Sequence, residues 1–173
     1  MIPSQRYFGT AALAAAAVTL CAQCDPVRGD AIDALGGEAP GVRRGPLHRP
    51  GQPCLLCHDG DFRDPEGFSV AGTVFLTPED RTAVNGATVH LTDATGSSFD
   101  ATTNAAGNFY ILPSQWTPHY PMTASVTPPA GAPIPMQTLI HTEGSCAGCH
   151  FDPAGTNSPG HLCIELADGG TPP

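Results

Sequence analysis

Glycine and proline recur along this chain so often that long helices cannot dominate its fold. Gly contributes 20 and Pro 19 of the 173 residues, which is nearly double their average usage. Pro interrupts a helix because it lacks an N–H donor, and Gly because its backbone is too free. The chain is nevertheless 40% hydrophobic, which argues against disorder. The length predicts one domain with room for one core.

In the central part of the chain, apolar and polar residues alternate as they do in β-strands. Val70, Gly72 and Val74 share one parity, and Ala71 and Thr73 share the other, which predicts a half-buried strand. Val89 and Leu91 share the inward parity of a second segment, with His90 facing outward. Strands are expected over residues 68–76, 87–92, 99–103, 108–112, 120–126 and 135–140. This spacing predicts a mainly β fold, a small antiparallel β-sandwich.

Residues 70–74 are VAGTV, residues 85–93 are NGATVHLTD and residues 102–110 are TTNAAGNFY. These three segments resemble the carboxypeptidase regulatory-like family. The resemblance covers roughly residues 68–127 and implies a transthyretin-like, seven-stranded sandwich. Such sandwiches are mostly passive scaffolds, so the resemblance carries over no catalytic residue.

Two copies of a C-x-x-C-H motif lie on either side of the expected sandwich, CLLCH at residues 54–58 and CAGCH at 146–150. This spacing is the attachment signature of c-type haem. The two thiols can bond the two vinyl groups of the macrocycle, and the following imidazole becomes the proximal iron ligand. The motifs therefore predict two haem c groups, held covalently by Cys54, Cys57, Cys146 and Cys149 and ligated by His58 and His150.

Two other interpretations of the cysteine pairs remain open. The four thiols could form a zinc site, or each pair could form a disulfide. Neither alternative requires a histidine directly after each pair, although His makes up only 7 of the 173 residues. Export also disfavours a zinc cluster, because paired thiols outside the cell tend to oxidise.

The first residues have the pattern of a secretory signal peptide over residues 1–22. A short segment with one positive charge precedes an uncharged, Ala-rich run over residues 8–20, which is too short to span a bilayer. Cleavage after Ala22 is favoured over lipidation at Cys21, because Leu20 is larger than the usual small residue. We therefore expect an exported protein, periplasmic, cell-surface or extracellular, without a transmembrane span in its mature chain.

The flanking segments 46–58 and 144–160 resemble secreted multihaem cytochromes c joined to regulatory-like sandwiches. The resemblance implies electron transfer outside the inner membrane. The expected organisation is a haem-binding segment over residues 23–67, the sandwich over 68–140 and a second haem-binding segment over 141–173.

The sixth iron ligands are expected from the remaining histidines, which would give low-spin sites with negative potentials. His48 and His141 each lie shortly before a motif, and His161 follows the second motif in a Pro-Gly loop. A methionine ligand would instead raise the potential. The candidates in order are His48, His161 and His141, followed by His90 and His119, with Met136 or Met122 as the methionine alternatives and Met122 better placed in the core.

Cys24 and Cys163 remain after the motif cysteines are counted. In an exported chain they are most simply joined as a disulfide, which would hold the two flanks together. In that case His48 would be placed to ligate the haem of the opposite flank. The alternative is two unrelated free thiols.

The charge balance limits the expected partners. Acidic residues outnumber basic ones 16 to 7, which argues against nucleic acid and anionic lipid. We expect a one-electron carrier rather than an enzyme, with redox proteins or extracellular electron acceptors as partners and with self-association that aligns haems as a further expectation. The alternatives are a haem enzyme that reduces peroxide or a small oxyanion at an open sixth position, and a non-redox binding module at the cell surface.

Overall fold

The structure, a computed structural model, describes residues 26–61, 64 and 66–165. The chain divides into two compact units, Met1–Gly36 and Gly37–Pro173. The described part of the first unit contains the helix α2 (Pro26–Ala34). The predicted signal peptide and Cys21 lie outside the described residues. Within the described part of the chain, no helix combines the length and the apolar character needed to cross a membrane.

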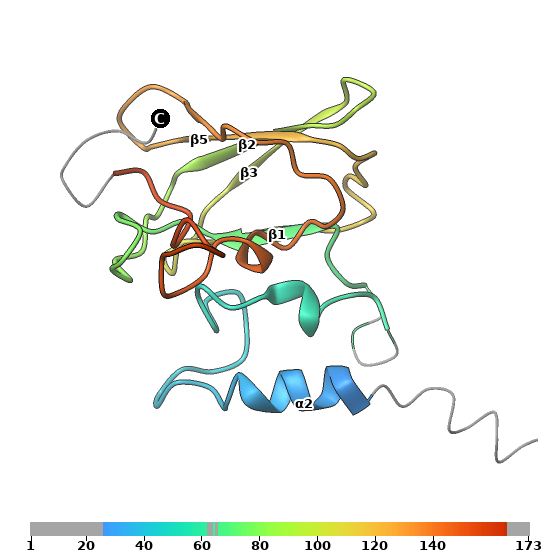
Figure 1. Cartoon of the computed structure of the whole chain (residues 1–173), viewed down its shortest axis with the longest axis vertical. Helices are drawn as coiled ribbons and strands as arrows, with labels where there is room; N and C mark the ends of the chain where they lie inside the picture. The colour runs from blue at the N-terminus through green and yellow to red at the C-terminus, as the bar shows by residue number, and fades with distance from the viewer. Residues whose placement is uncertain (1–25, 62–63, 65, 166–173) are drawn as a thin grey trace, which may run out of the picture. The chain divides into compact units, whose positions relative to one another are not determined.

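The second unit contains two antiparallel sheets, which confirms the prediction of a mainly β fold. In the smaller sheet, β1 (Val70–Thr73) pairs with β4 (Asn108–Ile111). In the larger sheet the strand order is β3-β2-β5-β6. Figure 1 shows β2, β3 and β5 in one layer and β1 in the other. The larger sheet comprises β2 (Thr88–Thr92), β3 (Ser98–Thr102), β5 (Thr123–Thr127) and β6 (Ile134–Pro135).

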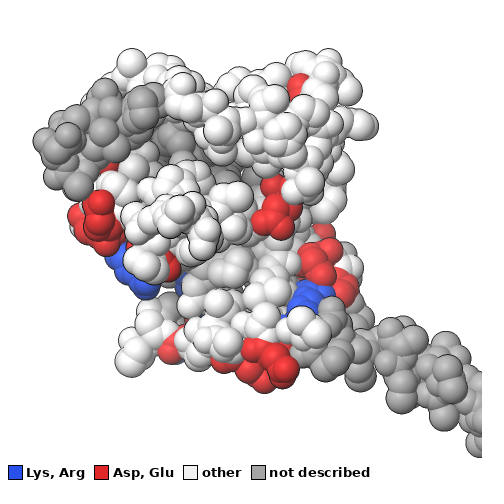
Figure 2. Space-filling view, viewed as in Figure 1, with Lys and Arg blue, Asp and Glu red and all other residues white. Residues whose placement is uncertain are grey.

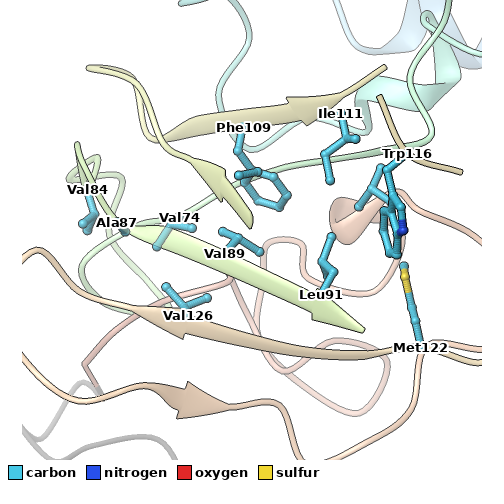
Figure 3. Close-up of a cluster of buried hydrophobic side chains, with 12 residues drawn as sticks. Val74, Val84, Ala87, Val89, Leu91, Phe109, Ile111, Trp116, Met122 and Val126 are labelled. Carbon is cyan, nitrogen blue, oxygen red and sulfur yellow. The ribbon is translucent and has the colours of Figure 1, made fainter. Parts of the chain in front are cut away.

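The core contains side chains from both sheets. Phe109 and Ile111 come from β4, Val89 and Leu91 come from β2, and all four are at most 1% exposed. Figure 3 shows these side chains grouped together, with Trp116 and Met122 beside Leu91. His90, between the two buried residues of β2, is exposed. The alternation predicted for this strand is therefore confirmed.

The expected strands over 120–126 and 135–140 differ in extent from the observed ones. β5 begins only at Thr123, and β6 consists of Ile134 and Pro135. Met122 and Ile140 still pair, but as an isolated bridge. Proline cannot donate to a ladder and is confined to edges of sheets, so Pro135 limits β6 to a short edge strand.

The expectation that the first strand is half-buried is wrong. All four residues of β1 are buried, although alternation would leave Ala71 and Thr73 on the outer face. The Ala71 N–H donates to the Gly144 carbonyl at 2.9 Å, and the Gly51 N–H donates to Thr73 Oγ1 at 2.8 Å. The outer side of β1 is therefore covered by residues of both motif-bearing flanks.

Candidate functional site

Each C-x-x-C-H motif forms one short helical turn. The turns are the 3-10 helices η1 (Cys54–Leu56) and η2 (Cys146–Gly148). The His58 N–H donates to the Cys54 carbonyl at 2.9 Å, and the His150 N–H donates to the Cys146 carbonyl at 2.8 Å. In both motifs these bonds hold the two cysteines and the histidine within one compact turn.

Both turns pack against β1, and the second does so with little spare space. A Cβ atom added at Gly72 would lie 2.8 Å from Cys146 Cβ and 3.0 Å from Cys146 Sγ. One at Gly144 would clash with the Ser69 carbonyl oxygen. Two glycines therefore allow the backbone before η2 and the Cys146 side chain to approach β1 closely.

Cys54 and Cys146, the first cysteines of the two motifs, are less exposed to solvent than Cys149. Burial raises the pKa of the Cys54 thiol to about 11 and that of Cys146 to about 12. The Cys54 thiol is near enough to Cys146 to contribute to the raised pKa of Cys146. Cys149 is exposed. The structure therefore brings the two motifs close together through their first cysteines.

His58, the histidine of the first motif, is fixed by a carboxylate and by ring stacking. Its Nδ1 donates to Asp64 Oδ2. Its ring stacks on Phe68 with centroids 4.4 Å apart, and Phe68 stacks on Tyr110 at 4.8 Å. A ligating histidine commonly donates its other ring nitrogen to a carboxylate or a carbonyl. This arrangement leaves Nε2 of His58 as the nitrogen available to a metal.

His150, the histidine of the second motif, has a neutral hydrogen-bond acceptor instead. Its Nδ1 donates to the Gly160 carbonyl at 3.1 Å. Burial lowers the pKa of His150, the bond to Gly160 acts in the opposite direction, and nearby His161 lowers it further. A neutral imidazole is the form that binds metals, and here too Nε2 is the available nitrogen.

His48 lies beside the first motif. Its ring centroid is 5.9 Å from that of His58, and the two ring planes are inclined at 74°. Its Nδ1 donates to Glu38 Oε1 at 3.3 Å, and Arg49 donates to the same oxygen at 3.1 Å. His48 and His58 therefore both have Nδ1 bonded to a carboxylate.

His161 lies near the second motif and is 4% exposed. Neither ring nitrogen makes a hydrogen bond of suitable geometry, although Asp152 Oδ2 lies 2.8 Å from Nε2. The ring packs against Phe75 with centroids 4.5 Å apart. Buried polar atoms in proteins are normally hydrogen-bonded, so the Nδ1 atom of His161 is an unsatisfied group next to Gly160, the residue that binds His150.

The other predicted ligands lie in less suitable surroundings. His141 is exposed. His90 Nδ1 lies 2.5 Å from Asp100, and His119 Nδ1 lies 3.4 Å from Asp93. Among the methionines, Met122 is 1% exposed within the core, as its parity predicted, and Met136 is half-buried.

The structure also describes the cysteines that the zinc and disulfide interpretations involve. Cys54, Cys57, Cys146 and Cys149 are all free thiols. No three His, Cys, Asp or Glu side chains are arranged to hold a metal ion within residues 26–61, 64 and 66–165. Cys24, one half of the predicted disulfide, lies outside the described residues. Cys163 is half-buried, and its backbone pairs with Phe75.

Sequence reasoning missed Asp64, Glu38 and Gly160, the acceptors of the histidine Nδ1 groups. Gly160 lies ten residues after His150, whereas Asp64, the acceptor in the first motif, lies six residues after His58. The sequence therefore contained no repeat that could have indicated them. Comparison with known proteins adds no further residue, because no family model, curated protein or solved structure matches this chain.

Proposed function

We propose that this protein is an exported electron carrier with two covalently attached haem c groups, one at each C-x-x-C-H motif. One observation carries the proposal. In each motif the cysteine pair and the histidine share one turn, and the histidine Nδ1 already donates to an acceptor. In both motifs, which lie far apart in the sequence, Nε2 is therefore the ring nitrogen left free to bind a metal.

The surroundings of the thiols also fit covalent attachment. Burial raises the pKa of the Cys54 thiol to about 11 and that of Cys146 to about 12, so both sulfur atoms lie in surroundings that suit an uncharged form. A thioether is uncharged and would have no cost of burial there. When bound, haem would supply one-electron Fe(III)/Fe(II) chemistry.

We further propose that each motif histidine is paired with a histidine from its own flank. The ring centroids of His48 and His58 are 5.9 Å apart, so the two residues would be near enough to hold the same group. This favours ligation by His48 within the first flank rather than across to the opposite flank.

His161 is the proposed partner of His150. It is buried near the second motif, its Nδ1 has no hydrogen-bond partner, and its Nε2 lies 2.8 Å from Asp152 Oδ2. Its neighbour Gly160 accepts the Nδ1–H of His150, so the two imidazoles belong to one local structure. Two histidines per site would give low-spin irons and negative potentials.

The chain's own contribution to electron transfer is to hold the two motifs together on β1. Both η1 and η2 contact this strand, which keeps the two proposed sites close enough for electron exchange. The formal net charge is −9, and Figure 2 shows several separate groups of acidic side chains on one face. We propose redox proteins or extracellular electron acceptors as partners, with self-association that aligns the sites as a further means of transfer.

The haem content of the exported protein tests the proposal. A pyridine haemochrome spectrum and the mass of the denatured protein should both give two haems per chain. The double variant Cys146→Ala/Cys149→Ala should retain one, at Cys54 and Cys57. The Cys163→Ala variant is the matched control and should retain both. A wild-type chain without covalent haem, or an unchanged haem content in the double variant, would contradict the proposal.

A further inference from the structure

The two motif histidines differ in the charge of the group that accepts their Nδ1–H. For His58 the acceptor is the Asp64 carboxylate, and for His150 it is the Gly160 backbone carbonyl. The turns themselves are alike, with the same backbone bond from the histidine to the first cysteine. The acceptor is therefore a clear chemical difference between two otherwise similar motifs.

An anionic acceptor alters the electron density on the ligating nitrogen. A carboxylate draws the Nδ1 proton toward itself and makes Nε2 a stronger electron donor. It also places a negative charge close to the site, which stabilises the oxidised state because that state has one more positive charge. A neutral carbonyl stabilises the oxidised state only weakly. A site whose histidine donates to a carboxylate therefore has a lower reduction potential than a site whose histidine donates to a carbonyl.

The first site is partly open to water. The Asp64 and His58 side chains are 29% and 27% exposed. This exposure screens the Asp64 charge, which makes its effect moderate.

We propose that Asp64 is a positioning residue that makes the first site the one of lower potential, so that electrons pass from the Cys54–His58 site to the Cys146–His150 site. This inference rests on the function proposed above. With haem bound, one electron would pass from the group held by Cys54, Cys57 and His58 to the group held by Cys146, Cys149 and His150, and no bond or proton would need to move. A reduced redox protein would donate the electron to the first site, and an oxidised acceptor would take it from the second.

The ring stack on His58 supports this role. The ring centroids of His58 and Phe68 are 4.4 Å apart and the ring planes are inclined by 23°. Phe68 lies two residues before β1, and its ring in turn stacks on Tyr110 of β4. Stacking on one face of the His58 ring limits its rotation, which helps to keep Nδ1 directed at Asp64.

The reduction potential of a single-haem protein tests the proposal. In the Cys146→Ala/Cys149→Ala background, Asp64→Asn should shift the first-site potential to more positive values in a spectroscopic redox titration. The amide oxygen can still accept from Nδ1, so the site should remain low-spin. In the otherwise wild-type protein, the same change should move only the lower of the two potentials.

Glu66→Gln is the matched control, because it removes the same charge from an exposed residue of the same loop. It should shift the potential less than Asp64→Asn does, and Asp64→Glu should restore most of the wild-type value. Equal shifts for Asp64→Asn and Glu66→Gln, or a shift of the higher potential instead, would overturn the proposal.

A readout without haem separates this inference from the proposed function. In the haem-free protein, nitrogen NMR should find the proton of neutral His58 on Nδ1, and Asp64→Ala should redistribute it toward Nε2. An Nδ1 proton that persists in Asp64→Ala would remove the role of Asp64 even if two haems are attached. A chain that never binds haem would instead refute the proposed function, and the potential difference with it.

Discussion

The two motif-bearing flanks rest on the same strand, β1, but they are held there by different means. The second motif is joined by backbone bonds from Ala71 to Gly144 and by the close approach of Cys146 to Gly72. The first is surrounded by polar side chains, among them Asp64 and Glu38, and by the Phe68 stack. The difference teaches that one five-residue motif can be supported by steric fit in one place and by side-chain electrostatics in another.

The largest effect should come from removing the support that both flanks share. Phe109 is 1% exposed in the core beneath β1, and Phe109→Ala should destabilise the fold by about 3–5 kcal/mol. Denaturant unfolding measures this loss, and both motifs should then lose haem attachment together. Thr102→Ala, at an exposed position of β3, is the control and should cost far less. Loss at one motif alone would contradict a shared support.

Gly72→Ala should affect the second motif more than the first. The added Cβ would lie 2.8 Å from Cys146 Cβ, so the turn must move away from β1. Overpacking of this kind typically costs about 1–3 kcal/mol. Mass spectrometry of the denatured protein should find less haem at Cys146 and Cys149 but full attachment at Cys54 and Cys57. Gly155→Ala, whose Cβ meets nothing within 4 Å, should change neither, and equal losses in both variants would exclude a steric cause.

Removal of each proposed distal histidine should open only its own site. His48→Ala should make the first site high-spin and able to bind carbon monoxide when reduced, and His161→Ala should do the same at the second. Optical spectra of the two variants measure this. His90→Ala is the control, because that residue lies on the outward face of β2. If His48→Ala keeps two low-spin sites, His141 becomes the next candidate.

The smallest effect should be a difference in thiol reactivity within the haem-free protein. Burial raises the pKa of Cys146 to about 12 and that of Cys54 to about 11. Since only the thiolate reacts, both should be alkylated more slowly near pH 8 than the exposed Cys149. Both rates should rise with pH up to these pKa values. Peptide mapping after iodoacetamide treatment measures them, and a Cys146 as reactive as the exposed Cys149 would contradict the burial.

The sequence by itself determined the features that depend on local spacing. The alternation of Val89, His90 and Leu91 fixed which face of β2 is buried, because successive side chains of a strand point to opposite faces. The spacing within each C-x-x-C-H motif likewise determined a single turn, because residues three and four apart lie together in a helical turn. These features were predictable, since each arises within a few residues of chain.

Only the tertiary structure decided what surrounds them. Ala71 and Thr73 are buried because flanks distant in the sequence cover β1, so their alternation did not indicate an exposed face. The acceptors differ because the loop after the first motif places the Asp64 side chain beside His58, whereas the loop after the second motif places the Gly160 backbone carbonyl beside His150. Contacts of this kind depend on how separate segments pack, and no local pattern records them. The sequence therefore determined where two cofactors are expected, while packing on β1 decided how the two sites differ.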